Sequence, residues 1–535
     1  MVESQAEVAR RYVSEGWWDG STLPSLLRDA IARSGSNRFS VHSALREWHG
    51  QLDDVVRLGL RLAGGLSRIG VRPGDRVAFQ LPNCVESAAT FYGLALMGAV
   101  LVPIDNAYAS RELEFILRSC NARTLVVADR VGTRIPLEEV NSIRGRLPSL
   151  ENVVVVGTDP IPAGAVRFNQ LAAGDPWRER VDVDPAAAAV IGWTSGTTAS
   201  PKGVVLSHRA LSAEVRLHMA PFLSHRTRPL ASTSPISHVT GMLVSVLVPP
   251  IIGHEIHLLD AWDPDFVLGL MIREQVSAGT GVPLFLSSLL DHPRISAEHL
   301  KLIEMSQLGG ASVPPDLVRR ADALGINVMR GYGCTEHSSV SLGRPDQPLE
   351  QRATTDGLPC PGVEVRIVDD TGVDLGAGTP GNILTRGPDL FSGYTDAKLT
   401  IEAFQDLTWF RTGDIGFIDH QGCLSVIGRA KDIIIRAGLN ISAAEVESVL
   451  VEMDGVIDAA VVAEEDARTG ERACAFLRIA PHTNAPTLES IRGFLARTGM
   501  AKYKWPEAIR LVDDDFPRTP AGKVRKNILR DSLKA

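Results

Sequence analysis

The chain has 535 residues, of which 44% are hydrophobic and 22% are charged, and its formal net charge is −8. One ordinary hydrophobic core does not organise a chain of this length, so we expect a globular protein of two or more domains. The negative charge argues against nonspecific binding of nucleic acid. No apolar run reaches the roughly 18 residues of a membrane-spanning helix.

The cysteines and the N-terminus bear on the cellular compartment. No Cys-x-x-Cys pair occurs, so neither a zinc site nor a disulfide framework is predicted. Residues 1–18 lack the apolar core of a signal peptide. The simplest expectation is a reducing cytoplasm. The cysteines are Cys84, Cys120, Cys334, Cys360, Cys423 and Cys474.

The first half of the chain alternates apolar segments with amphipathic ones. Residues 85–97 are predicted to form a helix between short strands. This alternation favours βαβ units and mainly parallel sheets, hence an α/β fold. The predicted strands are residues 76–81, 99–103, 124–128 and 152–157.

A predicted strand at residues 187–193 leads into a run of small, hydroxyl-bearing residues, Thr194-Ser195-Gly196-Thr197-Thr198-Ala199-Ser200-Pro201-Lys202-Gly203. Exposed backbone N–H groups, hydroxyls and one mobile ammonium group suit a triphosphate. The run is not a Walker A loop, because Pro201 precedes Lys202 and Gly203 follows it. The alternative interpretation is a surface loop of ordinary Ser/Thr/Gly composition.

Two segments in the middle of the chain are candidates for pocket walls. His238 lies within Pro235–Gly241, where a lone histidine among apolar residues is more often a hydrogen-bonded core residue than a catalyst. The second segment is Gly309-Gly310-Ala311. We interpret both as pocket residues, not as a nucleophile and its base.

The hexapeptide Gly331-Tyr332-Gly333-Cys334-Thr335-Glu336 combines three chemistries. Glycines on both sides of Tyr332 expose an aromatic face on which a purine can stack. Thr335 can donate to a phosphate, and Glu336 can hold Mg²⁺. A strand end followed by a turn explains the same composition without any ligand.

Between residues 332 and 412, short strands at 364–368 and 381–385 lie among Gly and Pro turns, which indicates an antiparallel β subdomain. Thr412-Gly413-Asp414 follows. A carboxylate after a glycine turn suits a grip on ribose hydroxyls, and Arg429 can supply a second contact. By itself, an aspartate in this position is more often a turn residue than a ligand.

The last hundred residues have their own pattern of strands and helices. Ser442 and Glu445 form a predicted capping box at the start of a helix that ends at Val451. Strands are predicted at 456–462 and 473–479, and a helix at 488–496. Near the C-terminus, Pro and Gly bracket a loop at residues 517–523 that can present the ammonium group of Lys523.

In this order, the motifs resemble those of the adenylate-forming enzymes: acyl-CoA synthetases, luciferase-like enzymes and the adenylation domains of peptide synthetases. The resemblance spans residues 194–523. It implies a large N-terminal domain (1–427) of parallel-rich sheets flanked by helices, with a β subdomain. It also implies a hinge (428–432) and a small, mobile α+β domain (433–535).

The resemblance also implies a role for each motif. Lys523 would neutralise charge during adenylation, Glu336 would hold Mg²⁺, Thr335 would contact phosphate, and His238 would line the pocket for the acid's carboxylate. Lys431 would be the hinge pivot, with Ala437 and Gly438 at the thiol tunnel. The implied nucleotide ligands are Thr194, Ser195, Gly196, Thr197, Thr198, Lys202, Gly309, Gly310, Ala311, Gly331, Tyr332, Gly333, Asp414 and Arg429.

The implied reaction is AMP-forming ligation of a carboxylic acid to CoA, with ATP, Mg²⁺ and CoA. Residues 232–242 hold no acid, which disfavours an amino-acid substrate. Arg228-Pro229-Leu230 does not match the Asn-containing segment of aryl-acid ligases. The N-terminus and the stretch from Arg344-Pro345 to Thr355-Asp356-Gly357 look most like cyclohexanecarboxylate-type and medium-chain ligases, so we expect a nonaromatic acid.

Two departures from the family pattern leave alternatives open. Ala199 and Ala437 stand where glycines are usual, the first in the ATP loop and the second beside the thiol tunnel. One alternative is an enzyme that stops at acyl-AMP and passes it to an acyl carrier protein or a partner enzyme. Another is a nucleotide-binding regulator without turnover, against which the joint presence of Lys523, Glu336 and Asp414 argues.

Overall fold

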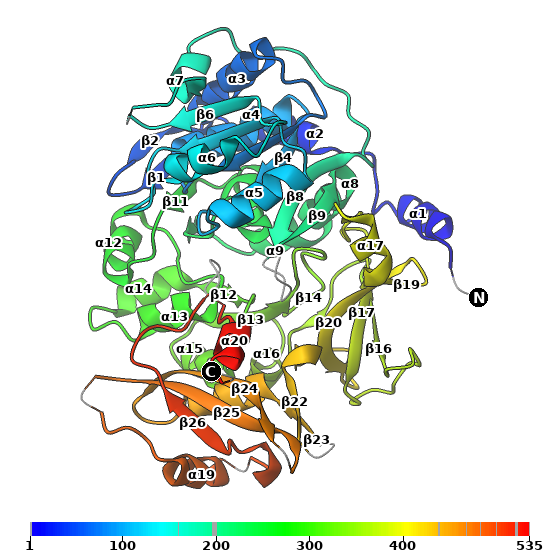
Figure 1. Cartoon of the computed structure of the whole chain (residues 1–535), viewed down its shortest axis with the longest axis vertical. Coiled ribbons are helices and arrows are strands. Elements are labelled where there is room, and N and C mark those ends of the chain that lie inside the picture. The colour runs from blue at the N-terminus through cyan, green and yellow to red at the C-terminus, as the bar shows by residue number, and fades with distance from the viewer. Residues whose placement is uncertain are drawn as a thin grey trace.

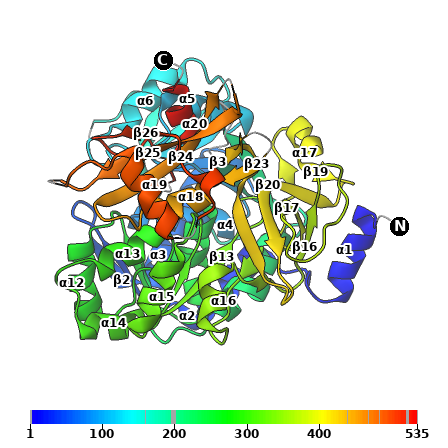
Figure 2. The ribbon, with the colours of Figure 1, turned by 90° about the horizontal axis from the view of Figure 1, so that it is seen from below.

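The computed structural model describes residues 3–158, 160–194, 201–436, 439–466, 468–481, 483–498, 500–518 and 523–533, without the side chain of Asn440. The chain folds into a large body and, at one end of it, a smaller body formed by the C-terminal elements (Figure 1). Figure 2 views the molecule from that end. The α/β class and the large and small parts expected from the sequence are confirmed.

The main sheet runs in the order β18-β9-β8-β4-β3-β5-β6-β7. Pairing is parallel from β8 through β7 and antiparallel at β9 and β18. Helices cover such a sheet on both faces, so its inner strands are apolar throughout. The strands are β3 (Arg76–Gln80), β4 (Val100–Pro103), β5 (Thr124–Ala128), β6 (Asn152–Val156), β7 (Ala165–Arg167), β8 (Ala188–Thr194), β9 (Lys202–Ser207) and β18 (Gly393–Tyr394).

The predicted elements of the first half are confirmed to within about a residue at each end. The predicted helix is α4 (Val85–Leu96), which packs on α3 (Leu52–Arg68). Glycines allow this close contact, since a Cβ on Gly93 would lie 2.2 Å from the carbonyl oxygen of Gly59. The other helices of this region are α1 (Gln5–Ser14), α2 (Leu23–Ser34), α5 (Ser110–Ser119), α6 (Pro136–Arg144) and α7 (Phe168–Leu171).

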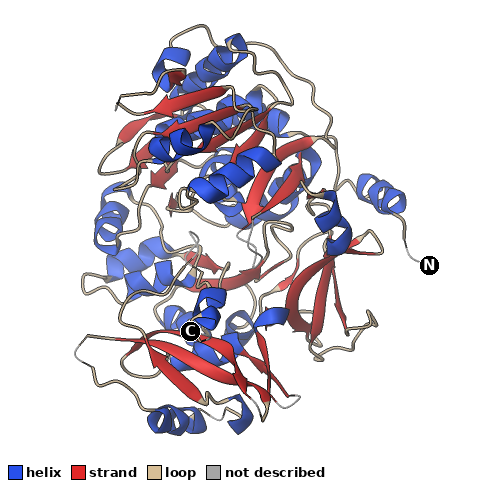
Figure 3. Cartoon of the chain, in the orientation of Figure 1, coloured by secondary structure: helices blue, strands red, loops and turns tan. Residues whose placement is uncertain are grey.

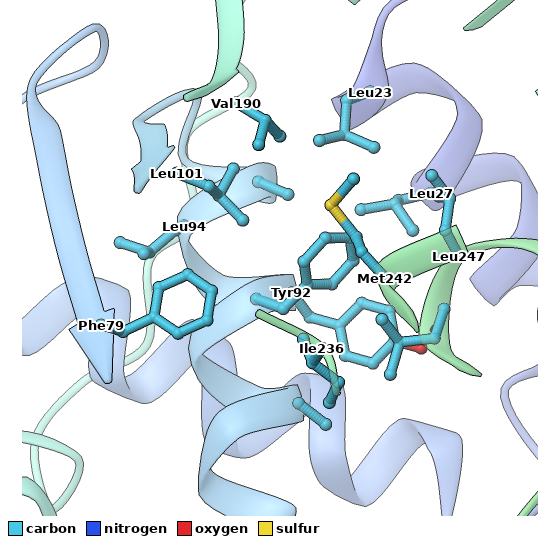
Figure 4. Packing of buried hydrophobic residues seen from close by; sticks show 14 of the residues in the cluster. Leu23, Leu27, Phe79, Tyr92, Leu94, Leu101, Val190, Ile236, Met242 and Leu247 are labelled. Atoms are coloured by element: carbon cyan, nitrogen blue, oxygen red, sulfur yellow. Dashed lines mark hydrogen bonds between the residues drawn. The ribbon is translucent and has the colours of Figure 1, made fainter. Parts of the chain in front are cut away.

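The largest hydrophobic cluster joins the main sheet to the helices beside it (Figure 4). Leu23 and Leu27 of α2 face Tyr92 of α4, whose phenol donates to the carbonyl oxygen of Val246 at 2.6 Å. Met242 and Leu247 close the cluster from the segment that follows His238. Ile236, which precedes His238, belongs to the same cluster, so the core fixes the chain on both sides of that histidine.

A second sheet has the order β10-β11-β1-β2, with β2 antiparallel to the rest. Its strands are β1 (Arg38–His42), β2 (Trp48–Gln51), β10 (Ala231–Ser232) and β11 (Ile256–Leu259). The helical segments before β10, between β10 and β11, and after β11 are α8 (His208–Ala213), the π-helical η1 (Glu214–Met219), α9 (Ala220–Leu223), α10 (Val239–Met242), the π-helical η2 (Leu243–Leu247), α11 (Val248–Ile251) and α12 (Pro264–Glu274).

A third sheet, in the order β12-β13-β14-β15, carries the two glycine-rich motifs at its strand ends. Its strands are β12 (Met305–Leu308), β13 (Asn327–Tyr332), β14 (Ser341–Leu342) and β15 (Leu358–Pro359). The helices around it are α13 (Pro283–Leu290), α14 (Ala297–Ile303), α15 (Pro315–Ala323) and α16 (Leu349–Thr354).

The predicted β subdomain is an antiparallel sheet, β16-β17-β20-β19, with β21 paired to β20. Figure 3 shows it as mostly strand, in contrast to the helix-rich region around the main sheet. The elements are β16 (Glu364–Val368), β17 (Gly381–Arg386), α17 (Ala397–Ala403), β19 (Phe404–Gln405), β20 (Trp409–Ile418) and β21 (Leu424–Arg429). Helix α1 lies at its side, where Arg11 bonds to Glu364 at 2.7 Å.

The smaller body has a sheet in the order β23-β22-β25-β24, with β26 parallel to β25. Its elements are β22 (Ile433–Arg436), β23 (Leu439–Ser442), α18 (Ala443–Leu450), β24 (Val456–Asp466), β25 (Gly470–Ile479), α19 (Leu488–Arg497), the 3₁₀ turn η4 (Lys502–Lys504), β26 (Ala508–Leu511) and α20 (Lys526–Asp531). Another 3₁₀ turn, η3 (Ala430–Asp432), connects the two bodies.

The predicted capping box of α18 is half formed. The Ser442 hydroxyl accepts a hydrogen bond from the Glu445 N–H at 3.2 Å. The Glu445 carboxylate is engaged by Lys504 Nζ at 2.6 and 2.7 Å, because η4 brings an ammonium group to the helix start. A long-range ion pair thus replaces the local bond that the sequence suggested. Among the described residues, no helix combines the length and apolar character needed to cross a bilayer.

Candidate active site

The two ends of the predicted phosphate loop are paired. Thr194 ends β8, Lys202 begins β9, and the two residues face each other in the antiparallel ladder. Ser195, Gly196, Thr197, Thr198 and Ala199 lie outside the described residues. Lys202 therefore lies beside Thr194, at the end of β8.

Tyr394, which the sequence analysis missed, joins Lys202 to Glu336. Its hydroxyl donates to Glu336 Oε1 at 2.8 Å, and Lys202 Nζ lies 5.1 Å from the centre of its ring. Burial, and then the Glu336 carboxylate, raise the pKa of the Tyr394 phenol. No local motif marks Tyr394, since only the pairing of β18 with β9 brings it here.

Thr335 and Glu336 occupy the tip of a tight turn. Cys334 and His337 close the turn with backbone bonds of 2.9 and 3.2 Å. Gly333 is required before it, because a Cβ there would lie 2.0 Å from the carbonyl oxygen of Ser338. Both side chains that carry the predicted chemistry are thus presented together, with neither fully buried.

Tyr332, Asp414 and Arg429 form a connected group. The Tyr332 hydroxyl donates to Asp414 Oδ2 at 2.5 Å, and Arg429 Nε pairs with Asp414 Oδ1 at 3.0 Å. The β20–β21 register places Asp414 directly opposite Arg429. Burial and then the Asp414 charge raise the pKa of the Tyr332 phenol. The predicted purine platform and the predicted ribose ligands therefore share one network.

Gly309 and Gly331, predicted from separate motifs, lie side by side. Gly309 follows β12 directly, and Gly331 lies in the paired strand β13. A Cβ on Gly309 would lie 2.8 Å from the Gly331 carbonyl oxygen. Gly310 has a φ of +73°, which L side chains rarely adopt. Gly310 and Ala311 are both exposed. The third sheet thus presents a bare backbone edge next to Tyr332.

His238 is held by a carboxylate that the sequence analysis missed. Its Nε2 lies 2.5 Å from Oδ2 of Asp105, whose side chain is 8% exposed. Asp105 lies two residues after the end of β4, and Gln80 Nε2 donates to its backbone carbonyl at 2.9 Å. A signal existed in the sequence: an acid just past a buried parallel strand lies at the sheet edge where ligands bind.

Lys523 reaches this region from the smaller body. Its ammonium group interacts electrostatically with Asp414, Arg429 and Asp432. Solvent reaches much of the residue, but the protein atoms around the ammonium group, and then Arg429, lower the pKa of Lys523. Arg518 and Val524 pair across the base of its loop.

The predicted pivot, Lys431, lies in η3 between the two bodies. Burial and the neighbouring Arg429 lower its pKa. Arg530 of α20 donates to its carbonyl oxygen at 3.3 Å. Ala437 and Gly438 lie outside the described residues, so the predicted thiol tunnel stays a prediction.

The large body thus brings Tyr332, Asp414 and Arg429 together, and the ammonium group of Lys523 from the small C-terminal body interacts electrostatically with Asp414 and Arg429. Comparison with known proteins agrees with the adenylate-forming class that the sequence motifs resemble. Residues 50–395 match the AMP-binding enzyme family and residues 445–523 match the AMP-binding enzyme C-terminal domain. The chain belongs to the AMP-binding enzyme family.

Named relatives cover nearly the whole chain. A medium-chain fatty-acid–CoA ligase of Escherichia coli (strain K12) is 33% identical over 98% of this chain and 92% of its own length. A 2,3-dihydroxybenzoate-AMP ligase of Bacillus subtilis (strain 168) is 30% identical over 98% and 95%. ATP-bound MatB from Rhodopseudomonas palustris superposes with a TM-score of 0.82, at 28% identity over 96% and 99%.

Proposed function

We propose that the chain is an AMP-forming acid:CoA ligase. It would activate a carboxylic acid with ATP to acyl-AMP and pyrophosphate, and then transfer the acyl group to the thiol of CoA. One observation carries the proposal: Lys523 of the smaller body approaches the Asp414–Arg429 pair, and the same Arg429 interacts with Glu336. Groups suited to ribose, phosphate and an anionic transition state therefore meet in one place.

The nucleotide would lie along this network. Asp414 and Arg429 would bind the ribose, and Tyr332 with Gly331, Gly333, Gly309, Gly310 and Ala311 would surround the base and the acyl group. The β- and γ-phosphates would contact Lys202, Thr335 and the hydroxyls of Thr194, Ser195, Thr197 and Thr198, with Gly196 leaving room for them. The bond between Tyr332 and Asp414 supports this assignment, since it fixes both groups before the nucleotide arrives.

The residues at the tip of the turn fit Mg²⁺. Glu336 offers a carboxylate, and Thr335 a hydroxyl, and Mg²⁺ prefers such oxygen ligands together with substrate phosphates. Tyr394 holds one carboxylate oxygen of Glu336 in place. When bound, the ion would offset negative charge on the phosphates.

In the first half-reaction, an oxygen of the acid attacks the α-phosphorus of ATP, and the bond from that phosphorus to pyrophosphate breaks. Lys523 would donate to the acid and the α-phosphate as charge develops there. His238, oriented by Asp105, would line the site of the acid's carboxylate. No covalent bond to the protein is needed.

In the second half-reaction, the thiol attacks the acyl carbon and AMP leaves. We infer that the smaller body rotates about Lys431 between the two steps, withdrawing Lys523 and presenting residues 435–441 to the thiol. The electrostatic interactions of Lys523 with Asp414 and Arg429 support the first arrangement as the one seen here.

The acid that we propose is nonaromatic, either alicyclic or of medium chain length. The 33% identity to a medium-chain ligase supports this choice. Because a dihydroxybenzoate-AMP ligase is 30% identical to this chain, aromatic acids must be tested beside the nonaromatic ones. Ala437, which stands where a glycine is usual, leaves one rival open for the second step: release of acyl-AMP to a carrier protein or partner enzyme.

One assay tests the proposal. The enzyme is incubated with MgATP and octanoate, cyclohexanecarboxylate, benzoate or salicylate, with and without CoA, and pyrophosphate, acyl-AMP and acyl-CoA are quantified. We expect acyl-CoA from the first two acids. Acyl-AMP without acyl-CoA contradicts the CoA step, preference for an aromatic acid contradicts the substrate class, and no pyrophosphate from any acid contradicts ligase activity.

A further inference from the structure

Five buried polar residues form a cluster beneath the turn that carries Thr335 and Glu336. They come from three parts of the chain: η1, the turn itself and the segment between β17 and β18. Each is at most 4% exposed. The cluster, called here the buried charge cluster, consists of Glu214, His218, His337, Ser339 and Asp389.

Two members tie the turn to the cluster. His337 follows Glu336 directly, and its Nε2 donates to Asp389 Oδ1 at 3.1 Å, while Nδ1 meets the Thr385 hydroxyl at 2.9 Å. Ser339 donates to Glu214 Oε1 at 2.7 Å. The chain is therefore fixed one and three residues after Glu336.

His218 joins the two carboxylates. Its Nε2 donates to the Pro361 carbonyl oxygen at 2.9 Å, and its Nδ1 faces Glu214 Oε2 at 3.0 Å and Asp389 Oδ2 at 3.8 Å. Burial would lower the pKa of His218, but Asp389 and Glu214 raise it to about 9. His218 is thus a cation between two anchors of the turn.

One candidate ligand atom from each of Glu214, His218 and Asp389 lies within 4.8 Å of the other two, close enough for a metal ion. The 3.0 Å separation of Nδ1 and Oε2 is that of a charge-assisted hydrogen bond. Ser339 and Pro361 complete the bonding of Glu214 and His218. A proton shared between His218 and Glu214 therefore accounts for the arrangement. Measuring the metal content of the purified protein distinguishes this interpretation from a bound metal ion.

We propose that Asp389, His218 and Glu214 are positioning residues for the adenylation step. They hold the turn so that Glu336 and Thr335 lie where they would bind MgATP. This rests on the proposed function of Glu336. Loss of one partner leaves a buried charge uncompensated, so the cluster shifts, and the turn shifts with it. The ribose side, held by Asp414 and Arg429, has its own attachment in β20 and β21.

The test is Asp389→Asn, which keeps the shape and one acceptor oxygen but removes the charge. Acyl-AMP formation is measured against Mg²⁺ concentration at fixed ATP. We expect the half-saturating Mg²⁺ concentration to rise about tenfold, as for other residues that orient metal ligands. The KM for the acid and the rate of thioester formation from supplied acyl-AMP should stay within twofold of the wild type.

Two further variants keep the test decisive. Thr385→Val removes one hydrogen bond of His337 without a charge change, so it should fold and shift the Mg²⁺ dependence in the same direction, by a smaller factor. The matched control is Asp322→Asn, which breaks the 2.6 Å ion pair to Arg352 away from the turn. Its Mg²⁺ dependence should equal that of the wild type.

Unchanged Mg²⁺ dependence in folded Asp389→Asn and Thr385→Val would overturn the positioning role. So would an equal shift in the control, or a stoichiometric transition metal that is present in the wild type and lost in Asp389→Asn. Absence of pyrophosphate from the wild type is a different outcome: it overturns the proposed function, and the positioning role with it, before any variant is compared.

Discussion

At the residue scale, the environment of a side chain decides between the interpretations that its sequence motif left open. Asp414 fits both a turn and a ribose ligand by sequence. In the structure it is 5% exposed, accepts from Tyr332 and pairs with Arg429. A carboxylate that only shaped a turn would not need two side-chain partners from different strands. The arrangement favours a preorganised binding group.

Lys523→Ala tests the role of the ammonium group. Because Lys523 would act only while charge develops on the α-phosphate, acyl-AMP formation should fall by about 10²-fold or more. Thioester formation from supplied acyl-AMP should remain largely intact. The two half-reactions are measured separately by pyrophosphate release and acyl-CoA production, and an equal loss in both would contradict a role confined to adenylation.

His218 predicts a pH dependence of stability. Its pKa is about 9 in the folded chain against 6.5 for the free side chain. Because the folded value is the higher one, the stabilisation is fully present below pH 6.5 and is lost as the pH rises through about 9. The shift corresponds to at most about 3 kcal/mol.

Denaturant unfolding of wild type and His218→Gln between pH 6 and about 10 measures this effect. The stability advantage of the wild type should shrink as the pH rises. A constant difference across the range would show that His218 carries no extra proton in the folded state.

At the element scale, the sequence predicted the regular structure well where local pattern and burial agree. The strand at 124–128 and the helix at 85–97 are apolar enough to identify without their neighbours. Tyr394 and Asp105 were missed because their roles arise from contacts with distant residues, Glu336 and His238. The prediction of a capping box at the start of α18 was only half right for the same reason, because Lys504, which is distant in sequence, binds the Glu445 carboxylate.

The contact between α3 and α4 supplies a prediction about helix packing. A methyl group on Gly93 would collide with the backbone of Gly59, so Gly93→Ala should lower the free energy of unfolding by about 1–3 kcal/mol. Gly269 of α12 has open space around it, and Gly269→Ala should raise stability by about 0.5–1 kcal/mol. Thermal unfolding of both variants should shift in opposite directions.

At the scale of the whole molecule, the two bodies meet at the proposed catalytic group. Ser442 of the smaller body donates to the Ile427 carbonyl oxygen of β21 at 2.7 Å, just before the connecting turn. Arg530 contacts the carbonyl oxygen of Lys431. These polar bonds at the connection suit the rotation that we propose for the smaller body.

Lys431→Pro tests rotation at this joint. Proline fixes φ near −65°, which suits the 3₁₀ turn seen here but restricts any large change. Adenylation should stay within a few-fold of the wild type, while acyl-CoA formation should fall about tenfold or more. If both half-reactions changed by the same factor relative to the wild type, the chain would pivot at another residue. Lys431→Ala is the control for loss of the side chain.

The β20–β21 hairpin has a consequence for how the chain can change in length. Arg429 is both the residue opposite Asp414 and the last residue before the connecting turn. One inserted residue in β21 would turn the Arg429 side chain to the other face of the sheet. It would also move the start of the smaller body by about 3.3 Å. Insertions and deletions here would therefore disturb the proposed nucleotide contact and the proposed domain motion together, whereas substitutions at other positions of the hairpin would not.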